Sequence, residues 1–310
     1  MGFFGPQRGR GIFLPRTGDG IEVSQYMAEK QKISARLKNV VVAVKQVPDT
    51  TQVKVDPETG TLIREGIPFI INPFDTHAVE TALQLKDKYG GKVIAITMGP
   101  PNAKETLRRC LALGVDDVIL ISDRAFGGAD TLATSLVLAE TIRRISEKFG
   151  PVDMVICGKQ TIDGDTAQVG PGIAMRLGFS QLTLVDQIMD VDPEKRTVTV
   201  RRKLEGRKEI ALAKLPALLT VVREINLPRY PIVNRRLLAE LVEIPTWTNE
   251  VLKLPGDRIG LKGSPTNVKK IFAPERKIGE ILGDGEKDPA GAVSLLIRKL
   301  AEKKLITAAF

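Results

Sequence analysis

From residue 39 onward, short apolar runs alternate with longer stretches in which apolar positions recur every three or four residues. The short runs are continuous, as in strands that are buried on both faces of a sheet. They lie at 39–48, 92–99, 115–122 and 152–158, and the helical patterns lie at 72–89, 102–114 and 130–150. Strands that alternate with helices of this length form βαβ units, so the pattern predicts a parallel sheet with right-handed crossovers.

The first of these helices is clearly bounded. Asn72 is a natural N-cap, Pro73 suits the first helical position, and Gly90 with Gly91 ends the helix after Tyr89. Three strands end in polar or Gly/Pro-rich segments, which read VKQVP, TMGP and CGKQ. Because parallel sheets bind ligands outside the carboxyl ends of their strands, these three ends predict a binding site.

The pattern changes after residue 178. Residues 195–215 alternate apolar and polar positions around Gly206, which predicts an antiparallel hairpin with one wet face, and PALLTVV predicts one more buried strand. A smaller hairpin is predicted where QVKVD and GTLIRE flank PETG. From residue 223 Pro recurs, so we expect extended chain with little core of its own. An amphipathic helix over 289–305 then packs either on its own domain or on another subunit.

These patterns divide the chain into three parts. Residues 1–38, rich in Gly and Arg, form an N-terminal extension that is either a flexible tail or a docking arm. Residues 39–228 form the main domain, and residues 229–310 form an arm. The predicted fold class is α/β: a parallel-sheet, Rossmann-like domain with an antiparallel hairpin extension and an extended C-terminal arm that ends in a helix.

Composition narrows the function. The net charge of +9 lies entirely between Lys195 and Arg236, where twelve Lys or Arg accompany three Asp or Glu. No aromatic residue interleaves with these charges before Tyr230, so a solvated hairpin face or an acidic protein partner explains them better than nucleic acid does. No apolar run approaches the ~18 residues that span a bilayer, so no transmembrane segment is expected.

Candidate catalytic side chains are sparse. The two cysteines, Cys110 and Cys157, sit in apolar surroundings without metal-ligand spacing, which indicates a reduced, cytosolic-type protein. The single histidine, His77, lies early in a helix, and no GxSxG motif accompanies it. We therefore expect no catalytic nucleophile, no metal site and no hydrolase activity.

The loop that follows the strand ending at Gly158 is the candidate site. The chain contains neither a Walker A motif nor GxGxxG. Gly158 allows a ligand to approach the backbone, Asp163 with Gly164 favours a tight turn, and Asp165 or Thr166 can cap the next helix. Free N–H groups and the positive end of a helix dipole would then lie beside the strand end, which favours an anion.

Side chains of the same loop point to a nucleotide. Gln160, Thr166 and Gln168 can donate hydrogen bonds to phosphate, ribose or the edge of a flavin. Asp163 and Asp165 repel a phosphate, so at least one of them should point away from it or meet ribose hydroxyls. A capped turn that binds nothing is the alternative interpretation.

Several segments resemble the small (β) subunit of electron transfer flavoproteins, including FixA-type members. The segments read NVVVAVKQVPDT, INPFDTHAVETALQLKD, TMGPP, LGVDDVILI and GKQTIDGDTAQVGP. This resemblance runs from about residue 39 to the C terminus and implies the adenine nucleotide alpha hydrolase-like variety of the fold. It also implies a heterodimer with an α subunit that carries an electron-transferring FAD, and an adenine nucleotide bound to this chain.

The resemblance leaves two ligands open. In conventional members the ligand is a structural AMP, and the dimer shuttles electrons from dehydrogenases to a quinone reductase. In the bifurcating group it is a second FAD that takes hydride from NADH and serves two acceptors. One is of low potential, a ferredoxin or flavodoxin, and the other is on the quinone or acyl-CoA dehydrogenase side. The stretch 47–83, in which GTLIREG is joined to INPFD, resembles the bifurcating group, so we expect FAD, with AMP as the alternative.

The resemblance also implies which residues contact the nucleotide, and none of them is catalytic. By position they are Ala43, Asn72, Pro73, Phe74, Asp75, Met98, Gly158, Lys159, Gln160, Thr161, Ile162, Asp163, Gly164, Asp165, Thr166, Ala167, Gln168 and Val169. They fall on the three strand ends, one helix N-terminus and the loop.

Partner contacts are implied at RYPIVNRR, residues 229–236, which resembles the family's recognition loop for partner dehydrogenases. The expected contact residues are Arg229, Tyr230, Ile232 and Val233, with Val233 where many members have leucine. Further candidate partners are a FixC-like quinone oxidoreductase and a FixX-like ferredoxin-type subunit. The expected location is the cytoplasm, with peripheral attachment to the inner face of the membrane through such partners as an open alternative.

Two interpretations from other classes stay open. One is a nucleotide-binding regulatory module of the stress-protein type, which would be stable and colourless without an α subunit. The other is a basic nucleic-acid binder acting through residues 195–236, which would show steeply salt-dependent binding to random duplex.

Overall fold

The computed structural model describes residues 36–49, 54–55, 62–63, 68–267 and 279–306. The chain falls into two compact units, one with residues 1–55 and 63–268 and the other with residues 56–62 and 269–310. The predicted N-terminal extension up to residue 35 lies outside the described residues, as does the PETG turn of the smaller hairpin. The strands on either side of that turn, β3 (Lys54–Val55) and β4 (Leu62–Ile63), pair with each other as expected.

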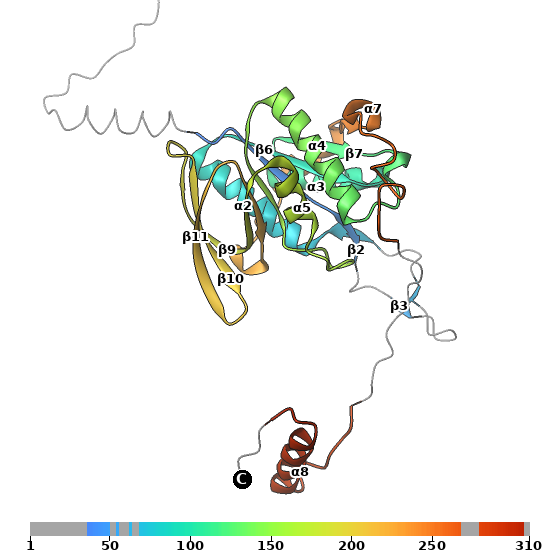
Figure 1. Cartoon of the computed structure of the whole chain (residues 1–310), viewed down its shortest axis with the longest axis vertical. Coiled ribbons are helices and arrows are strands. Elements are labelled where there is room, and N and C mark those ends of the chain that lie inside the picture. Colours follow the sequence, from blue (N-terminus) through green and yellow to red (C-terminus); the bar gives the residue numbers. More distant parts are fainter. Residues whose placement is uncertain (1–35, 50–53, 56–61, 64–67, 268–278, 307–310) are drawn as a thin grey trace, which may run out of the picture. The chain divides into compact units, whose positions relative to one another are not determined.

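A nine-stranded sheet forms the centre of the first unit, in the order β11-β10-β9-β12-β8-β1-β6-β7-β13 (Figure 1). All neighbours from β9 to β13 pair in parallel, and β10 and β11 add an antiparallel ribbon at one edge. The strands are β1 Asn39–Ala43, β6 Lys92–Met98, β7 Asp117–Ile121, β8 Val152–Gly158, β9 Ser180–Asp192, β10 Thr197–Leu204, β11 Arg207–Lys214, β12 Ala217–Val221 and β13 Thr246–Trp247. The α/β fold with a parallel sheet and a hairpin extension is thus confirmed, and Gly206 with φ of 72° turns the hairpin.

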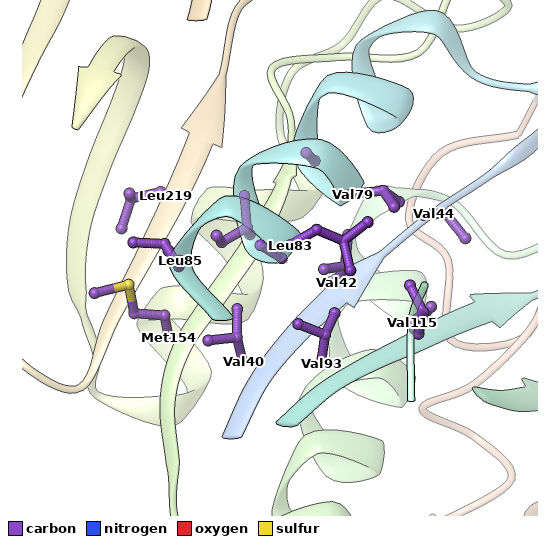
Figure 2. Packing of buried hydrophobic residues seen from close by; sticks show 14 of the residues in the cluster. Val40, Val42, Val44, Val79, Leu83, Leu85, Val93, Val115, Met154 and Leu219 are labelled. Atoms are coloured by element: carbon purple, nitrogen blue, oxygen red, sulfur yellow. The ribbon is translucent and has the colours of Figure 1, made fainter. Parts of the chain in front are cut away.

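Helices cover both faces of this sheet. They are α2 Pro73–Tyr89, α3 Lys104–Leu113, α4 Thr131–Phe149, α5 Val169–Leu177, α6 Val233–Leu241 and α7 Asn249–Leu252. Side chains of α2 and α3 share one hydrophobic cluster, and side chains of α4 and α5 share the other. Strand β1 contributes alternately to the two clusters, with Val40 and Val42 beside α2 (Figure 2) and Val41 and Ala43 on the opposite face. Each fully buried Val or Leu there stabilises the fold by about 1.5–3 kcal/mol.

The apolar run 39–48 was expected to be one strand, and this prediction is wrong. β1 ends at Ala43, and β2 (Gln46–Pro48) leaves the main sheet to pair antiparallel with β5 (Phe69–Ile71). The chain turns at Lys45, whose N–H donates to the Asp75 carboxylate and whose carbonyl accepts from the Asn72 N–H. A tertiary contact with the start of α2 therefore overrides the local apolar pattern.

The segment after residue 223 is more structured than its prolines predicted. It forms α6, α7 and the edge strand β13, in which Thr246 and Trp247 pair with Leu120 and Ile121 of β7. Trp247 and Leu252 are buried in the cluster beneath α4. The prolines bound these elements instead of interrupting them, and the unit that holds the sheet continues past residue 228 to residue 268.

The second unit contains the predicted last helix, α8 (Pro289–Glu302). Asp288 caps it by accepting a hydrogen bond of 2.9 Å from the Gly291 N–H, and Lys299 pairs with Glu280. Within the described residues, none of the helix's side chains is buried. None of the described helices in either unit is long and apolar enough to cross a membrane.

Candidate nucleotide-binding site

The three predicted strand ends do meet at one edge of the sheet. In the parallel register Ala43 lies opposite Ile96 of β6 and Cys157 of β8. Met98 therefore lies two residues, and Gly158 one residue, beyond the level of Ala43. This edge is the carboxyl edge, where open parallel sheets bind their ligands.

Asn72 connects the start of α2 to the loop after β8. Its side-chain amide donates to the Gln160 carbonyl at 2.9 Å and accepts from the Ile162 N–H at 3.2 Å. It precedes Pro73, the first residue of α2, as predicted, but its side chain makes no capping hydrogen bond to the helix. The side chain is fully buried, so both of its hydrogen-bonding groups are used inside the protein.

Asp75, in the first turn of α2, connects two strand ends. Its carboxylate accepts from the Lys45 N–H at 2.8 Å and from the Gly158 N–H at 3.0 Å. Burial raises the pKa of this carboxyl to about 7, although these hydrogen bonds and one with Asn72 favour the ionised form. Asp75 thus titrates in the neutral range at the centre of the candidate site.

The acidic residues of the loop are held by neighbours. Lys45 Nζ pairs with Asp163 at 2.7 Å, and the Gln160 amide donates to Asp165 at 2.6 Å. Desolvation raises the pKa of Asp163, but the hydrogen bonds from Lys45 and Thr161 and the positive charge of Lys45 together outweigh it and leave the pKa below its ordinary value. The predicted repulsion of a phosphate is therefore reduced for Asp163 by a lysine that the sequence pattern did not single out.

The prediction that Asp165 or Thr166 caps the next helix is wrong. Helix α5 begins at Val169, Gln168 occupies the N-cap position without a side-chain cap, and the Gln168 carbonyl oxygen Oε1 accepts from the Thr131 hydroxyl at 2.8 Å. Asp165 and Ala167 instead adopt left-handed backbone conformations, with φ of 53° and 55°. These conformations carry the exposed loop around to α5.

The loop presents donors that could hold an anion. Among the described residues, the backbone N–H groups of Thr166, Ala167 and Gln168 donate no hydrogen bond, and they lie just before the positive end of the α5 dipole. The nearby Phe74 ring carries two cations, Lys159 Nζ at 5.3 Å and the Arg223 guanidinium at 4.7 Å from its centroid. These groups fit the phosphate end of a nucleotide.

The two cysteine thiols of the chain are buried. Cys157 lies beneath the candidate site, and burial raises the pKa values of Cys157 and Cys110, to about 12 for Cys110. Both thiols are therefore inert. No group of His, Cys, Asp and Glu among the described residues has the geometry of a metal site. The described loop and strand ends offer groups that can bind and orient a ligand.

Replacing Asp165 with alanine should release nucleotide from this loop. The change removes the acceptor for Gln160 and leaves alanine in a left-handed conformation that costs about 1–2 kcal/mol. We expect the nucleotide released from the purified protein on denaturation to fall several-fold. Asp257→Ala, at an exposed aspartate for which the described structure shows no side-chain hydrogen bond, is the control. An unchanged nucleotide content in Asp165→Ala would count against the loop.

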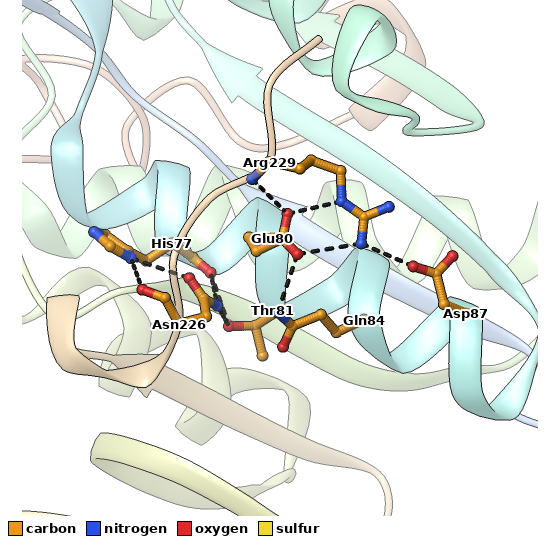
Figure 3. Close-up of polar contacts among 7 residues, drawn as sticks. All are labelled: His77, Glu80, Thr81, Gln84, Asp87, Asn226 and Arg229. Carbon is orange, nitrogen blue, oxygen red and sulfur yellow. Dashed lines mark hydrogen bonds and ion pairs between the residues drawn. The ribbon is translucent and has the colours of Figure 1, made fainter. Parts of the chain in front are cut away.

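A second network anchors the segment that leads to the predicted recognition loop (Figure 3). Arg229 donates to Glu80 from its backbone N–H at 3.1 Å and from Nε at 2.8 Å, and its guanidinium also reaches Asp87 at 2.8 Å. The Asn226 side-chain amide donates to the Thr81 hydroxyl at 2.8 Å, and its amide oxygen Oδ1 lies 3.0 Å from His77 Nδ1. All four partners lie on α2, so this helix holds the base of the segment.

The sequence pattern did not identify Glu80 as part of this network. Only 5% of Glu80 is exposed, within an otherwise apolar stretch of α2 that reads AVETAL. A carboxylate on a buried helical face is rare unless it is paired. A glutamate within this apolar stretch is therefore the signal from which a buried ion pair could have been predicted, although the sequence does not identify its partner. Beyond Arg229 the side chains are open to solvent: Tyr230 is 92% exposed, and Ile232 and Val233 are exposed as well.

The positive charge of residues 195–236 is largely paired within the fold. The ion pairs are Lys195–Asp192, Arg196–Asp153, Arg201–Asp186, Arg202–Glu209, Lys203–Glu224, Lys208–Asp186 and Arg229–Glu80. Seven of the twelve cations of this segment are thus paired with acids of the same chain, which lowers the charge that the segment offers to a polyanion.

Comparisons with known proteins assign most of the chain to one family. The family described as "Electron transfer flavoprotein domain" matches residues 59–251. The chain is 47% identical over 263 residues to Protein FixA of Azotobacter vinelandii, covering 84% of this chain and 93% of that protein. It is 47% identical to the electron transfer flavoprotein subunit beta of Clostridium acetobutylicum, covering 86% of this chain and 100% of that protein. It is also 47% identical to the caffeyl-CoA reductase-Etf complex subunit CarD of Acetobacterium woodii, covering 86% and 99%.

Proposed function

Because the chain belongs to the electron transfer flavoprotein family as a β-type subunit, we propose that it binds a second FAD at the 158–169 loop and serves in electron bifurcation. Family membership itself implies association with a flavin or nucleotide and pairing with an α subunit. The proposal adds the identity of the ligand, the electron donor NADH and the two classes of acceptor. The unbonded N–H groups of the loop and the strand ends at the carboxyl edge of the sheet support a nucleotide site, and the resemblance of residues 47–83 to bifurcating members carries the choice of FAD.

The residues present fit the phosphate and ribose parts of such a ligand. The N–H groups of residues 166–168 and the cations Lys159 and Arg223 would hold the diphosphate. Gln160, already ordered by Asp165, would face ribose or the flavin edge. When bound, FAD would accept hydride from NADH and pass its electrons on singly, to the α-subunit FAD and to a ferredoxin or flavodoxin. The protein's part is to bind the cofactor, to orient it and to set the charge around it.

The stretch 47–83 favours FAD over AMP through its resemblance to bifurcating members. The alternative is AMP in the same loop, with conventional shuttling between dehydrogenases and a quinone reductase. AMP would use the same phosphate and ribose contacts, so the loop geometry alone fits both ligands.

The test is made under anaerobic conditions on the heterodimer co-expressed with its α subunit. Released FAD and AMP are quantified per dimer, and the flavin absorbance is then titrated with NADH. We expect two FAD per dimer and prompt bleaching by NADH. One FAD with one AMP, unresponsive to NADH, would overturn bifurcation and leave the conventional shuttle.

We also propose that residues 229–241 dock a partner oxidoreductase. The exposed apolar side chains on this segment and its helix α6 are Tyr230, Ile232, Val233, Leu237, Leu238 and Leu241. Arg235 and Arg236 lie among them and suit an acidic surface. The relative from Acetobacterium woodii is named as a subunit of a caffeyl-CoA reductase-Etf complex, which gives a precedent for a complex of this family with a reductase. For this chain, a quinone oxidoreductase with a ferredoxin-type subunit is the partner we propose.

The C-terminal arm is proposed to pack on the α subunit. In α8 the side chains of Val293 and Leu296 are about half exposed, and Ile281 before the helix is almost fully exposed. A helix with an uncovered apolar stripe gains stability from a partner surface. Truncation before residue 279 should therefore weaken retention of the α subunit during gel filtration, and full retention would overturn this assignment.

A further inference from the structure

We infer that Asn72 and Asp75 hold the nucleotide loop in place without contacting the nucleotide through their side chains, and that Asp75 takes up a proton from solvent when the nucleotide binds. This inference rests on the proposed function, since it concerns the same loop. It changes the role expected of two residues, from ligand contacts to positioning residues.

The side chains of Asn72 and Asp75 use their hydrogen-bonding groups within the protein. Asn72 is fully buried, and Asp75 is only 4% exposed. The amide of Asn72 is used at both ends by Gln160 and Ile162, and each oxygen of Asp75 accepts one backbone N–H, from Lys45 and Gly158. The two side chains thereby fix both the beginning of the loop and the strand ends beneath it, and neither leaves a free polar atom directed at solvent.

The charges around Asp75 explain why this carboxylate is the group that takes up the proton. Lys45, the cation whose charge acts on Asp75, directs its ammonium group to Asp163 at 2.7 Å, and the thiols of Cys157 on β8 and Cys110 on α3 also interact with Asp75. Both thiols are neutral because burial raises their pKa values. A carboxylate buried without a dedicated cation already has a pKa near neutrality, about 7.

A bound nucleotide would raise the pKa of Asp75 further. Its phosphates place negative charge at the strand ends, and the bound molecule excludes water from them. Both effects disfavour the carboxylate form of Asp75, so its pKa rises and binding is accompanied by transfer of up to one proton from water to the carboxyl. By linkage, nucleotide affinity then increases as the pH falls through the neutral range.

The test measures AMP binding calorimetrically to the heterodimer, with α-subunit FAD in place and the loop emptied by dialysis. Titrations between pH 6 and 8.5, in buffers of different ionisation enthalpy, give the number of protons taken up. AMP's own phosphate also titrates near pH 6, so the comparison is between wild type and Asp75→Asn. The matched control is Asp153→Asn, a fully buried carboxylate at the opposite end of β8 that accepts from the Lys38 N–H and pairs with Arg196.

We expect wild type and Asp153→Asn to take up more protons than Asp75→Asn, by a difference of up to one. The wild-type affinity should accordingly rise by up to about tenfold more per unit fall in pH near neutrality. Infrared difference spectra of the wild-type protein provide a second readout that does not depend on how Asp75→Asn folds, and in them AMP should increase the C=O band of a protonated carboxyl. Equal proton uptake in all three proteins, or no such band, would overturn the inference alone. Failure of wild type to bind AMP or FAD at all would overturn the proposed function as well.

Discussion

Replacing Gly158 with alanine is expected to empty the nucleotide loop and to destabilise the protein by about 2 kcal/mol. A Cβ at this position would lie 2.5 Å from the Asp75 carboxylate, 2.5 Å from Phe74 Cβ and 2.9 Å from the Phe74 carbonyl carbon. All three atoms belong to residues in the first turn of α2, and one of them is a backbone atom, so the helix itself would have to move. The movement would break the bond from the Gly158 N–H to Asp75 and displace the loop that follows.

Two measurements check this result. The nucleotide released per heterodimer should fall to near zero, and the thermal unfolding midpoint should drop by about 4–8 °C. Gly256→Ala is the control, because a Cβ there meets nothing within 4 Å and the backbone is not in the left-handed region. A Gly158→Ala protein with full nucleotide and an unchanged midpoint would show that the start of α2 is not packed against the loop.

Replacing Arg229 with alanine should release the recognition segment from α2. The change leaves Glu80 buried without its guanidinium partner, which is the costly way to break an ion pair. Removing one partner of a fully buried ion pair usually costs about 3–5 kcal/mol. Because the Arg229 side chain is 35% exposed and partly screened by solvent, we expect the free energy of unfolding to fall by about 2 kcal/mol. The segment after residue 229 should become more sensitive to trypsin at Arg235 and Arg236.

The control for this second prediction is Lys203→Ala. Lys203 also pairs with a glutamate, Glu224, but both side chains are about half exposed, so little stability depends on the pair. A double substitution, Arg229→Leu with Glu80→Leu, should recover part of the stability without restoring protection from trypsin. If Arg229→Ala and Lys203→Ala lowered stability equally, Glu80 would not be a buried anchor.

Features with a local cause could be predicted from the sequence. The bounds of α2 follow from Pro73 at its start and Gly90 at its end, and Gly206 marks the hairpin turn. The three strand ends were identified because apolar runs stop there, and the parallel register brings them to one level. These features were predicted correctly because their signal lies within a few neighbouring residues and no distant contact overrides it.

Features that depend on distant partners could not be predicted. Asn72 is of a residue type that is common at N-caps, but its side chain forms hydrogen bonds with residues 160 and 162, about ninety positions away in sequence. Lys45 and Glu80 gain their roles from Asp163 and Arg229, which sequence spacing does not place beside them. Helix α6 was missed because its flanking prolines suggested extended chain, whereas they only bound it.

The attachment of two regions to α2 has a consequence for protein engineering. The start of the helix holds the nucleotide loop through Asn72 and Asp75, and its middle holds residues 226–229 through Glu80 and Thr81. A helix of 17 residues is a rigid spacer of about 25 Å. A recognition segment grafted from another family member would therefore need its own α2 surface to seat correctly. Exchange of the segment together with α2 would in turn put the cofactor loop at risk, so the transferable module in a chimera comprises the helix, the loop and the segment together.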